Sequence, residues 1–178
     1  MPVTHDEWAL VRRTVALSIR SGLHCAIASR DPDGLPHLTP IGSVILTDVG
    51  KGFYFDIFNQ ELARNLTTDG RVTILAVDSG KLMWLRSLLK GSFVRPPGVR
   101  MTAEVGQPRP STPEEIKQFH RVVGPMLRTR GGRLLWGRLP LVRDLRINTI
   151  TPLSTGRMTS GASPTATINR AEIFSPRS

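Results

Sequence analysis

Residues 39–43 read TPIGS and residues 59–66 read NQELARNL, and the chain from 23 to 78 is organised around these two segments. That stretch holds three short runs rich in β-branched and aromatic residues, one short helical segment and a fourth run, with Asp, Gly or Pro between them. The alternation predicts an antiparallel meander with one inserted helix. Pro40 and Gly42 lie inside the second run, where proline donates no amide hydrogen and glycine often marks a bulge. We therefore expect an irregular strand whose free backbone amides can face a ligand.

The chain has 178 residues, of which 39% are hydrophobic and 21% are charged. Such a chain is typical of one domain with its own core. We expect a single domain over residues 1–155 and an irregular tail over residues 156–178, because the tail is rich in Ser, Thr, Gly and Pro. No apolar run approaches the roughly 20 residues of a bilayer-spanning helix, and Asp6 and Glu7 interrupt the place of a secretory signal. These features predict a cytoplasmic protein without a membrane span.

Turn and capping residues predict the order of the elements. Capping boxes open two amphipathic helices, THDE at residues 4–7 and TPEE at residues 112–115. The first helix is expected to end at Gly22 and the second at Gly131–Gly132. Further short helices are expected at 60–68, at 81–90 and after residue 133. Strands are expected at Leu23–Arg30, His37–Thr47, Phe53–Phe58, Arg71–Asp78, Arg100–Val105 and Leu145–Thr151.

Several kinds of chemistry are excluded by what the chain lacks. Cys25 is the single cysteine, so no internal disulfide can form, and its apolar neighbours predict a buried thiol. A nucleophilic pair of Cys25 with His24 is disfavoured, because adjacent strand residues point to opposite faces. The sequence contains no dinucleotide or phosphate glycine loop, no Cys-x-x-Cys, no His-Glu-x-x-His and no serine nucleophile elbow, and its four histidines are scattered. We therefore predict no metal site and identify no catalytic residue. What remains is a function in which a bound organic cofactor does the chemistry, or one without chemistry.

The formal charge of +10 is concentrated in the second half of the chain. Residues 1–80 carry 7 Lys or Arg against 9 Asp or Glu, whereas residues 81–178 carry 17 against 5. A basic half can bind nucleic acid or another anionic surface. However, only Trp84 and Trp136 are interleaved with its arginines as rings on which bases could stack. A nucleic-acid partner is accordingly the last of the alternatives.

Five motifs, in this order, resemble the pyridoxamine 5'-phosphate oxidase-like, FMN-binding split-barrel family. They are DPDG at 31–34, PHLTP at 36–40, FYF at 53–55, RNL at 64–66 and RVTIL at 71–75. The resemblance implies a mainly β fold with flanking helices, built as a six-stranded Greek-key split β-barrel. It also implies a homodimer that holds FMN in grooves between its subunits.

The resemblance also indicates which residues contact the cofactor: Thr39, Pro40, Ile41, Gly42, Ser43, Ile57, Asn59, Arg64 and Asn65. The amides around Gly42 and the guanidinium of Arg64 are expected to hold the phosphate. Many family members carry Ser, Arg or Lys just before the RNL motif, whereas this chain has Gln, Glu and Leu at residues 60–62. Arginines such as Arg138 or Arg146 can compensate across the dimer, or the groove can hold a deazaflavin or haem instead.

Three functions follow as hypotheses. The first is an FMN-dependent oxidoreductase, in which flavin N5 exchanges hydride with a small-molecule substrate and the protein contributes orientation and dryness. The second is a carrier or sensor that binds flavin, deazaflavin or haem without turnover. The third is a binder of nucleic acid or an anionic surface through the basic half of the chain.

Overall fold

The computed structural model describes residues 3–159 and 166–167. In chain order the elements are α1 (His5–Gly22), β1 (Cys25–Arg30), β2 (Pro36–Ile41), β3 (Ile45–Leu46), β4 (Lys51–Phe55), α2 (Gln60–Thr68), β5 (Arg71–Val77), α3 (Lys81–Lys90), β6 (Gly98–Pro110), α4 (Pro113–Val123), the 3₁₀ helix η1 (Gly124–Arg128), α5 (Arg130–Trp136), β7 (Leu141–Pro152), the 3₁₀ helix η2 (Gly156–Thr159) and β8 (Ala166–Thr167).

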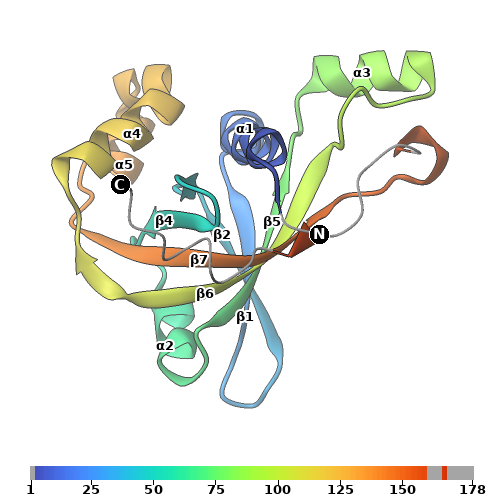
Figure 1. The fold of residues 1–178 in the computed structure, drawn as a ribbon. Coiled ribbons are helices and arrows are strands. Elements are labelled where there is room, and N and C mark those ends of the chain that lie inside the picture. Colours follow the sequence, from blue (N-terminus) through green and yellow to red (C-terminus); the bar gives the residue numbers. More distant parts are fainter. Residues whose placement is uncertain (1–2, 160–165, 168–178) are drawn as a thin grey trace, which may run out of the picture.

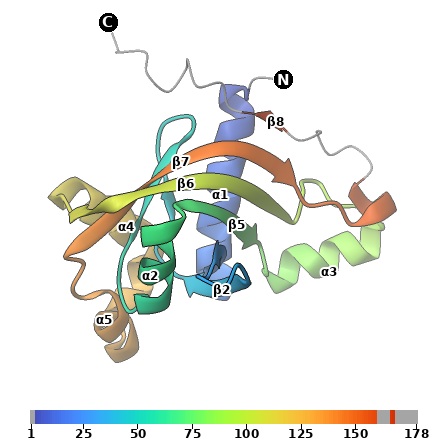
Figure 2. The same cartoon turned by 90° about the horizontal axis from the view of Figure 1, so that it is seen from below.

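The strands form one antiparallel sheet in the order β2-β1-β5-β6-β7-β4-β3, and β8 pairs with β7 off this path. In Figure 1 the helices α1, α3, α4 and α5 lie on one side of the strongly curved sheet and α2 lies on the other. The view from below in Figure 2 shows the same arrangement, with α1 behind β6 and β7. The predicted mainly β fold with flanking helices is therefore confirmed.

The predicted count of six strands in a Greek-key order is not confirmed, since seven strands lie along the path of the sheet. The expected strand His37–Thr47 is split into β2 and β3 by the irregular residues 42–44. Both β3 and β8 are two residues long, and so short a strand has no alternation that a sequence can display. In the other direction, β6 and β7 extend well beyond the predicted strands, to 13 and 12 residues.

Helix α1 covers one face of the sheet and begins and ends as predicted. Thr4 and Glu7 form the capping box. The stripe Trp8, Val11, Val15 and Ile19 is buried, and burial of each such side chain stabilises the fold by about 1.5–3 kcal/mol. The Trp8 indole donates a hydrogen bond of 2.9 Å to the carbonyl of Thr47, which ties the helix to the turn before β4.

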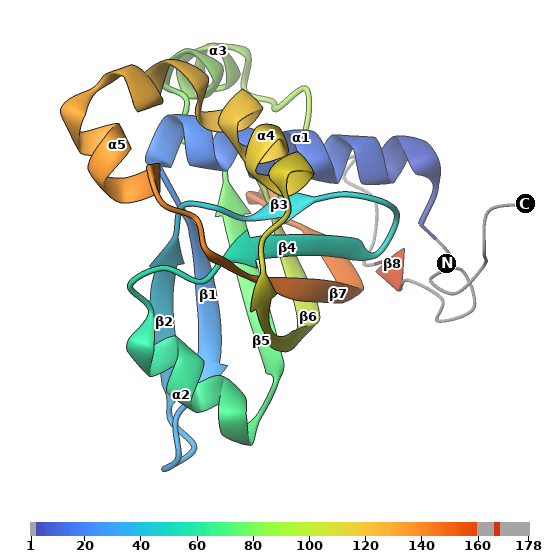
Figure 3. The same ribbon diagram turned by 90° about the vertical axis from the view of Figure 1, so that its left-hand side faces the viewer.

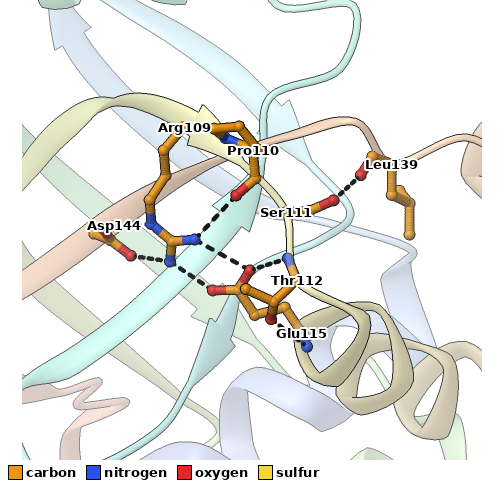
Figure 4. Close-up of polar contacts among 7 residues, drawn as sticks. All are labelled: Arg109, Pro110, Ser111, Thr112, Glu115, Leu139 and Asp144. Atoms are coloured by element: carbon orange, nitrogen blue, oxygen red, sulfur yellow. Dashed lines mark hydrogen bonds and ion pairs between the residues drawn. The ribbon is translucent and has the colours of Figure 1, made fainter.

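A network of ion pairs fixes α4 to the long strands (Figure 4). The guanidinium of Arg109 on β6 donates to both carboxylate oxygens of Asp144 on β7, at 2.9 and 2.6 Å, and to those of Glu115 on α4, at 3.2 and 2.5 Å. Glu115 also completes the predicted capping box with Thr112. Burial alone raises the pKa of Glu115, but the hydrogen bonds from Arg109 and Thr112 outweigh it and leave that pKa below its ordinary value. The start of α4 is thereby held in place.

The expected end of the second helix at Gly131–Gly132 is wrong, because both glycines lie inside α5. The helix breaks earlier, at η1, and Thr129 starts the next one by accepting a hydrogen bond of 3.0 Å from the Gly132 amide. Gly132 packs so closely on the carbonyl of Met126 that a side chain would collide with it. Gly132 thus allows a tight connection between η1 and α5.

The predicted tail contains η2 and β8 within the described residues, and its remaining residues lie outside them. Among the helices that the structure describes, none combines the length and hydrophobicity that crossing a bilayer requires.

Candidate cofactor-binding site

A pocket of about 290 Å³ is lined by residues of β2, β4 and α5 and of the segments that follow α1 and β4. Figure 3 shows α5 beside the end of α1. We call this cavity the Trp136 pocket. The predicted site residues that line it are Pro40, Ile41, Gly42, Ser43, Ile57 and Asn59. Its other lining residues are Leu23, His24, Phe55, Phe58, Leu135 and Trp136. The two segments singled out in the sequence therefore meet at one cavity.

Gly42 and Ser43 shape the floor of this pocket. A Cβ at Gly42 would lie 2.7 Å from the Leu23 carbonyl oxygen and 3.4 Å from the Trp136 ring, so only glycine fits there. The Ser43 hydroxyl accepts a hydrogen bond of 3.1 Å from the Phe55 amide and donates one of 3.2 Å to the Phe55 carbonyl. The hydroxyl thus replaces regular strand pairing and is already engaged. Within the described residues, no acceptor is found for the amides of Gly42 and Ser43.

Backbone strain is concentrated at the same pocket. In the described part of the chain, Leu23 and Phe58 are the non-glycine residues with positive φ, at 65° and 60°. This left-handed conformation costs an L-residue about 1–2 kcal/mol. Leu23 is the C-cap of α1, where such a conformation ends the helix. Phe58 does not cap a helix, and its side chain is 79% exposed, so packing of the side chain does not offset the cost of the left-handed conformation. Strained residues of this kind cluster at ligand sites.

The N-terminus of α2 lies at the edge of the pocket. Asn59 precedes the helix and makes no side-chain capping hydrogen bond, while its carbonyl accepts from Ala63. The amides of residues 60–62 therefore lack intrahelical partners at the positive end of the helix dipole. The carboxylate of Glu61, which follows Gln60 in the first turn of α2, lies 3.2 Å from Nε2 of His37 and so contacts this imidazole. An anion can bind at such a terminus.

The remaining predicted site residues do not line the pocket. Arg64 is exposed on α2, and none of the described carboxylates pairs with it. Asn65 is buried and donates a hydrogen bond of 3.0 Å to the Ser29 hydroxyl, which fastens α2 to β1. The Thr39 hydroxyl is buried without a hydrogen-bond partner in the described structure. Their roles toward a cofactor remain predictions. Of the arginines named for compensation, Arg146 forms an ion pair with Glu104.

His24 lines the pocket, whereas the adjacent Cys25 does not. Nδ1 of His24 lies 2.8 Å from the Gly22 carbonyl oxygen, a contact that requires a proton on Nδ1 and leaves Nε2 free in the neutral ring. Cys25 is buried, as predicted, and burial raises the pKa of its thiol to about 12. A thiolate nucleophile is therefore not available at this position.

Six of the lining residues were not among the predicted site residues: Leu23, His24, Phe55, Phe58, Leu135 and Trp136. Trp136 reaches the pocket through ring contacts, since its centroid lies 5.9 Å from that of Phe119, which in turn lies 5.4 Å from that of Phe55. A local sequence pattern cannot predict such a contact between segments that are far apart in the chain. Trp84, the other ring considered for base stacking, is half-buried and donates to the Asp78 carbonyl at 2.7 Å.

The chemistry of the Trp136 pocket follows from its walls. They are mostly apolar and aromatic, and the described residues that line the pocket include no Lys or Arg. Where the structure is described, no group of three or more His, Cys, Asp or Glu could hold a metal ion. The pocket can therefore take a flat apolar ring system, and the α2 terminus can take an anionic group attached to that ring.

Two solved structures share this fold. The FMN-binding protein from Syntrophomonas wolfei aligns with a TM-score of 0.55 and 14% identity, over 84% of this chain and 89% of its own. HupZ of Group A Streptococcus aligns with a TM-score of 0.52 and 16% identity, over 86% of this chain and 96% of its own. No family model and no curated protein matches the sequence. The predicted resemblance to the FMN-binding split barrels is confirmed at the level of the fold.

Proposed function

We propose that this chain, whose fold is that of an FMN-binding split barrel, holds FMN in the Trp136 pocket and works as a flavin-dependent oxidoreductase. The observation that carries the proposal is that an aromatic-walled pocket and an uncapped helix N-terminus meet at Asn59. FMN combines the two chemical features that this arrangement suits, a flat ring system and a phosphate.

Each part of the site has a role toward such a ligand. Phe58 offers an apolar ring face for the isoalloxazine, the largely buried Trp136 contributes to the apolar wall, and the amides of Gly42 and Ser43 offer donors to the polar edge of the ring system. The first amides of α2 offer donors to the phosphate, with Asn59 beside them. When bound, the flavin supplies hydride transfer at N5. The contribution of the chain is to orient the ring and exclude water.

A second copy of the chain completes the groove in this proposal. The volume of the pocket, about 290 Å³, is slightly below the roughly 300–1,000 Å³ that small-molecule sites occupy, so in this proposal one chain encloses only part of FMN. Phe58 and Leu135 stand at its rim with 79% and 50% of their surface exposed. Exposed apolar groups beside a site favour burial by a partner. The described lining of the pocket also contains no Lys or Arg, and the basic half of a second copy can bring cations to it.

A haem carrier is the second candidate, and His24 is the observation that favours it. Its ring is oriented by the Gly22 carbonyl, and Nε2 remains free in a pocket whose walls are mostly apolar. A histidine that donates its other ring N–H to a backbone carbonyl is the usual form of a metal-binding imidazole.

Titration of the purified protein with FMN, riboflavin and haem, followed by visible absorption, tests these proposals. FMN is expected to bind at one molecule per chain and more tightly than riboflavin, because a helix N-terminus stabilises an anion by up to about 2 kcal/mol, or about 30-fold in affinity. Equal affinity for FMN and riboflavin would remove the α2 terminus from the site. Binding of neither flavin would overturn the main proposal.

Two further measurements separate the candidates. Reduction of bound flavin by NADH or NADPH is expected for an oxidoreductase, whereas a carrier binds flavin without this turnover. His24→Ala is expected to abolish the histidine-ligated absorption band of a haem complex and to leave FMN binding nearly unchanged. Haem binding that persists in His24→Ala with an unaltered spectrum would exclude His24 as the ligand.

A further inference from the structure

A second cavity, of about 440 Å³, is lined by residues of α1, α4 and the β3 region. Figure 3 shows α1, α4 and β3 next to one another. We propose that this cavity binds an amphipathic organic anion, with a carboxylate or phosphate head and an aliphatic body. Its charged wall is formed by Arg12 and Arg13 of α1 and Arg121 of α4, and we call it the arginine cleft. It shares no lining residue with the Trp136 pocket, so the two sites can be tested separately.

The three arginines of the cleft are without acidic partners. Across the described residues, no carboxylate pairs with any of them, and no Asp or Glu lines the cavity. Arg121 lies in the last turn of α4, where the helix dipole favours a cation. That explanation does not reach Arg12 and Arg13, which lie in the middle of α1. Like charges gathered around one cavity repel each other, and an anion between them relieves the repulsion.

Guanidinium groups fit such an anion in geometry as well as charge. Each can grip a carboxylate or phosphate through two parallel N–H bonds. The walls that carry them are held together, because Nε of Arg20 on α1 donates a hydrogen bond of 3.2 Å to the Val122 carbonyl on α4. The cleft is therefore framed by two helices that are linked directly.

The floor of the cleft is apolar, which specifies the rest of the ligand. Val15, Val44 and Leu46 lie there and are 1%, 0% and 4% exposed. Ala9 and Ala16 line the α1 side, and their small side chains leave the space between the helices open. None of the described residues that line the cavity is aromatic, so they give neither a base nor an isoalloxazine a ring to stack on. A ligand with an aliphatic chain and an anionic head can place the chain against the apolar floor and the head beside the arginines.

Isothermal titration with four probes tests the proposal on the full chain. Decanoate and decyl phosphate, which differ in the source of the charge, are both expected to bind. Decanol lacks the anionic head and inorganic phosphate lacks the aliphatic body. The affinity of each is expected to be at least about tenfold lower than that of decanoate. If decanol binds as well as decanoate, or if neither decanoate nor decyl phosphate binds, the proposal is overturned.

Variants locate the binding. The double variant Arg13→Gln with Arg121→Gln is expected to weaken decanoate binding by at least about tenfold, and Ala16→Leu is expected to block it sterically without changing the charge. Arg100→Gln, on exposed β6 surface away from the cleft, is the matched control and is expected to have no effect. Equal losses in the control and the double variant would contradict the site. All variants are expected to keep the FMN affinity of the parent, so failure of one proposal does not imply failure of the other.

Discussion

Replacement of Phe58 by glycine is expected to weaken flavin binding while it leaves the free energy of unfolding nearly unchanged. The φ of 60° at Phe58 costs an L-residue about 1–2 kcal/mol, and glycine removes that cost. Glycine also adds conformational freedom to the unfolded chain, which lowers stability by about 0.5–1 kcal/mol. The backbone terms alone therefore favour the variant slightly.

The lost packing offsets this gain. Phe58 is 79% exposed, so it buries about a fifth of the roughly 150–250 Å² that a phenylalanine can bury. At about 25 cal/mol per Å², this fifth corresponds to about 1 kcal/mol. The gain from the backbone and the loss of side-chain packing therefore cancel to within about 1 kcal/mol. By contrast, Phe55→Ala should destabilise the protein by about 3–5 kcal/mol, because Phe55 is 1% exposed.

Urea unfolding followed by circular dichroism, together with FMN titration, tests both halves of this prediction. Loss of the ring face should raise the dissociation constant of FMN by about 2- to 13-fold, since an aromatic pair contributes about 0.5–1.5 kcal/mol. A loss of unfolding free energy above about 3 kcal/mol would show that Phe58 is a packed residue whose strain serves the fold. An unchanged FMN affinity would show that the exposed ring takes no part in binding.

Three further predictions concern single residues. Cys25, with its thiol pKa raised to about 12 by burial, should resist iodoacetamide at pH 8 in the folded protein and react after unfolding; rapid alkylation of the folded protein would contradict its burial. Glu115→Gln should lower the unfolding free energy by about 1 kcal/mol at pH 7. Because the folded pKa of Glu115 is lowered, this difference should be complete above the unfolded pKa and should fade as the pH drops below about 4.3; a difference that grows in acid would refute the role of the ion pair with Arg109. Gly42→Ala should destabilise the fold by about 1–3 kcal/mol through overpacking. Gly131 has open space around it in α5, so Gly131→Ala should stabilise the fold by up to about 1 kcal/mol. Equal effects of the two variants in thermal unfolding would exclude the close approach at Gly42.

Local chemistry in the sequence was sufficient for much of the fold. The capping boxes at residues 4–7 and 112–115 identified the starts of α1 and α4, because a cap depends on residues within one turn. Pro40 and Gly42 marked the break between β2 and β3 for a similar reason. Residues 40–43 at this break line one pocket together with Ile57 and Asn59, so six predicted site residues meet there.

Long-range packing decided what the sequence could not show. Glycine is a usual helix terminator, but Gly131 and Gly132 both lie inside α5, where Gly132 packs closely on Met126 of η1. Trp136 joins the pocket only because that connection returns the chain to β4 through Phe119. Asn65 resembled a groove residue in its motif, yet its orientation toward Ser29 depends on how α2 packs on β1.

The position of the flavin is tested most directly by amide chemical shifts of the ¹⁵N-labelled protein during titration with FMN. The largest changes are expected at the amides of Gly42, Ser43 and Gln60 and at the indole N–H of Trp136, because these groups line the pocket or open α2. The indole of Trp84 on α3 serves as the internal control and should remain unchanged. Changes that are absent from the Trp136 pocket, or that occur at α3 or the arginine cleft instead, would contradict the account.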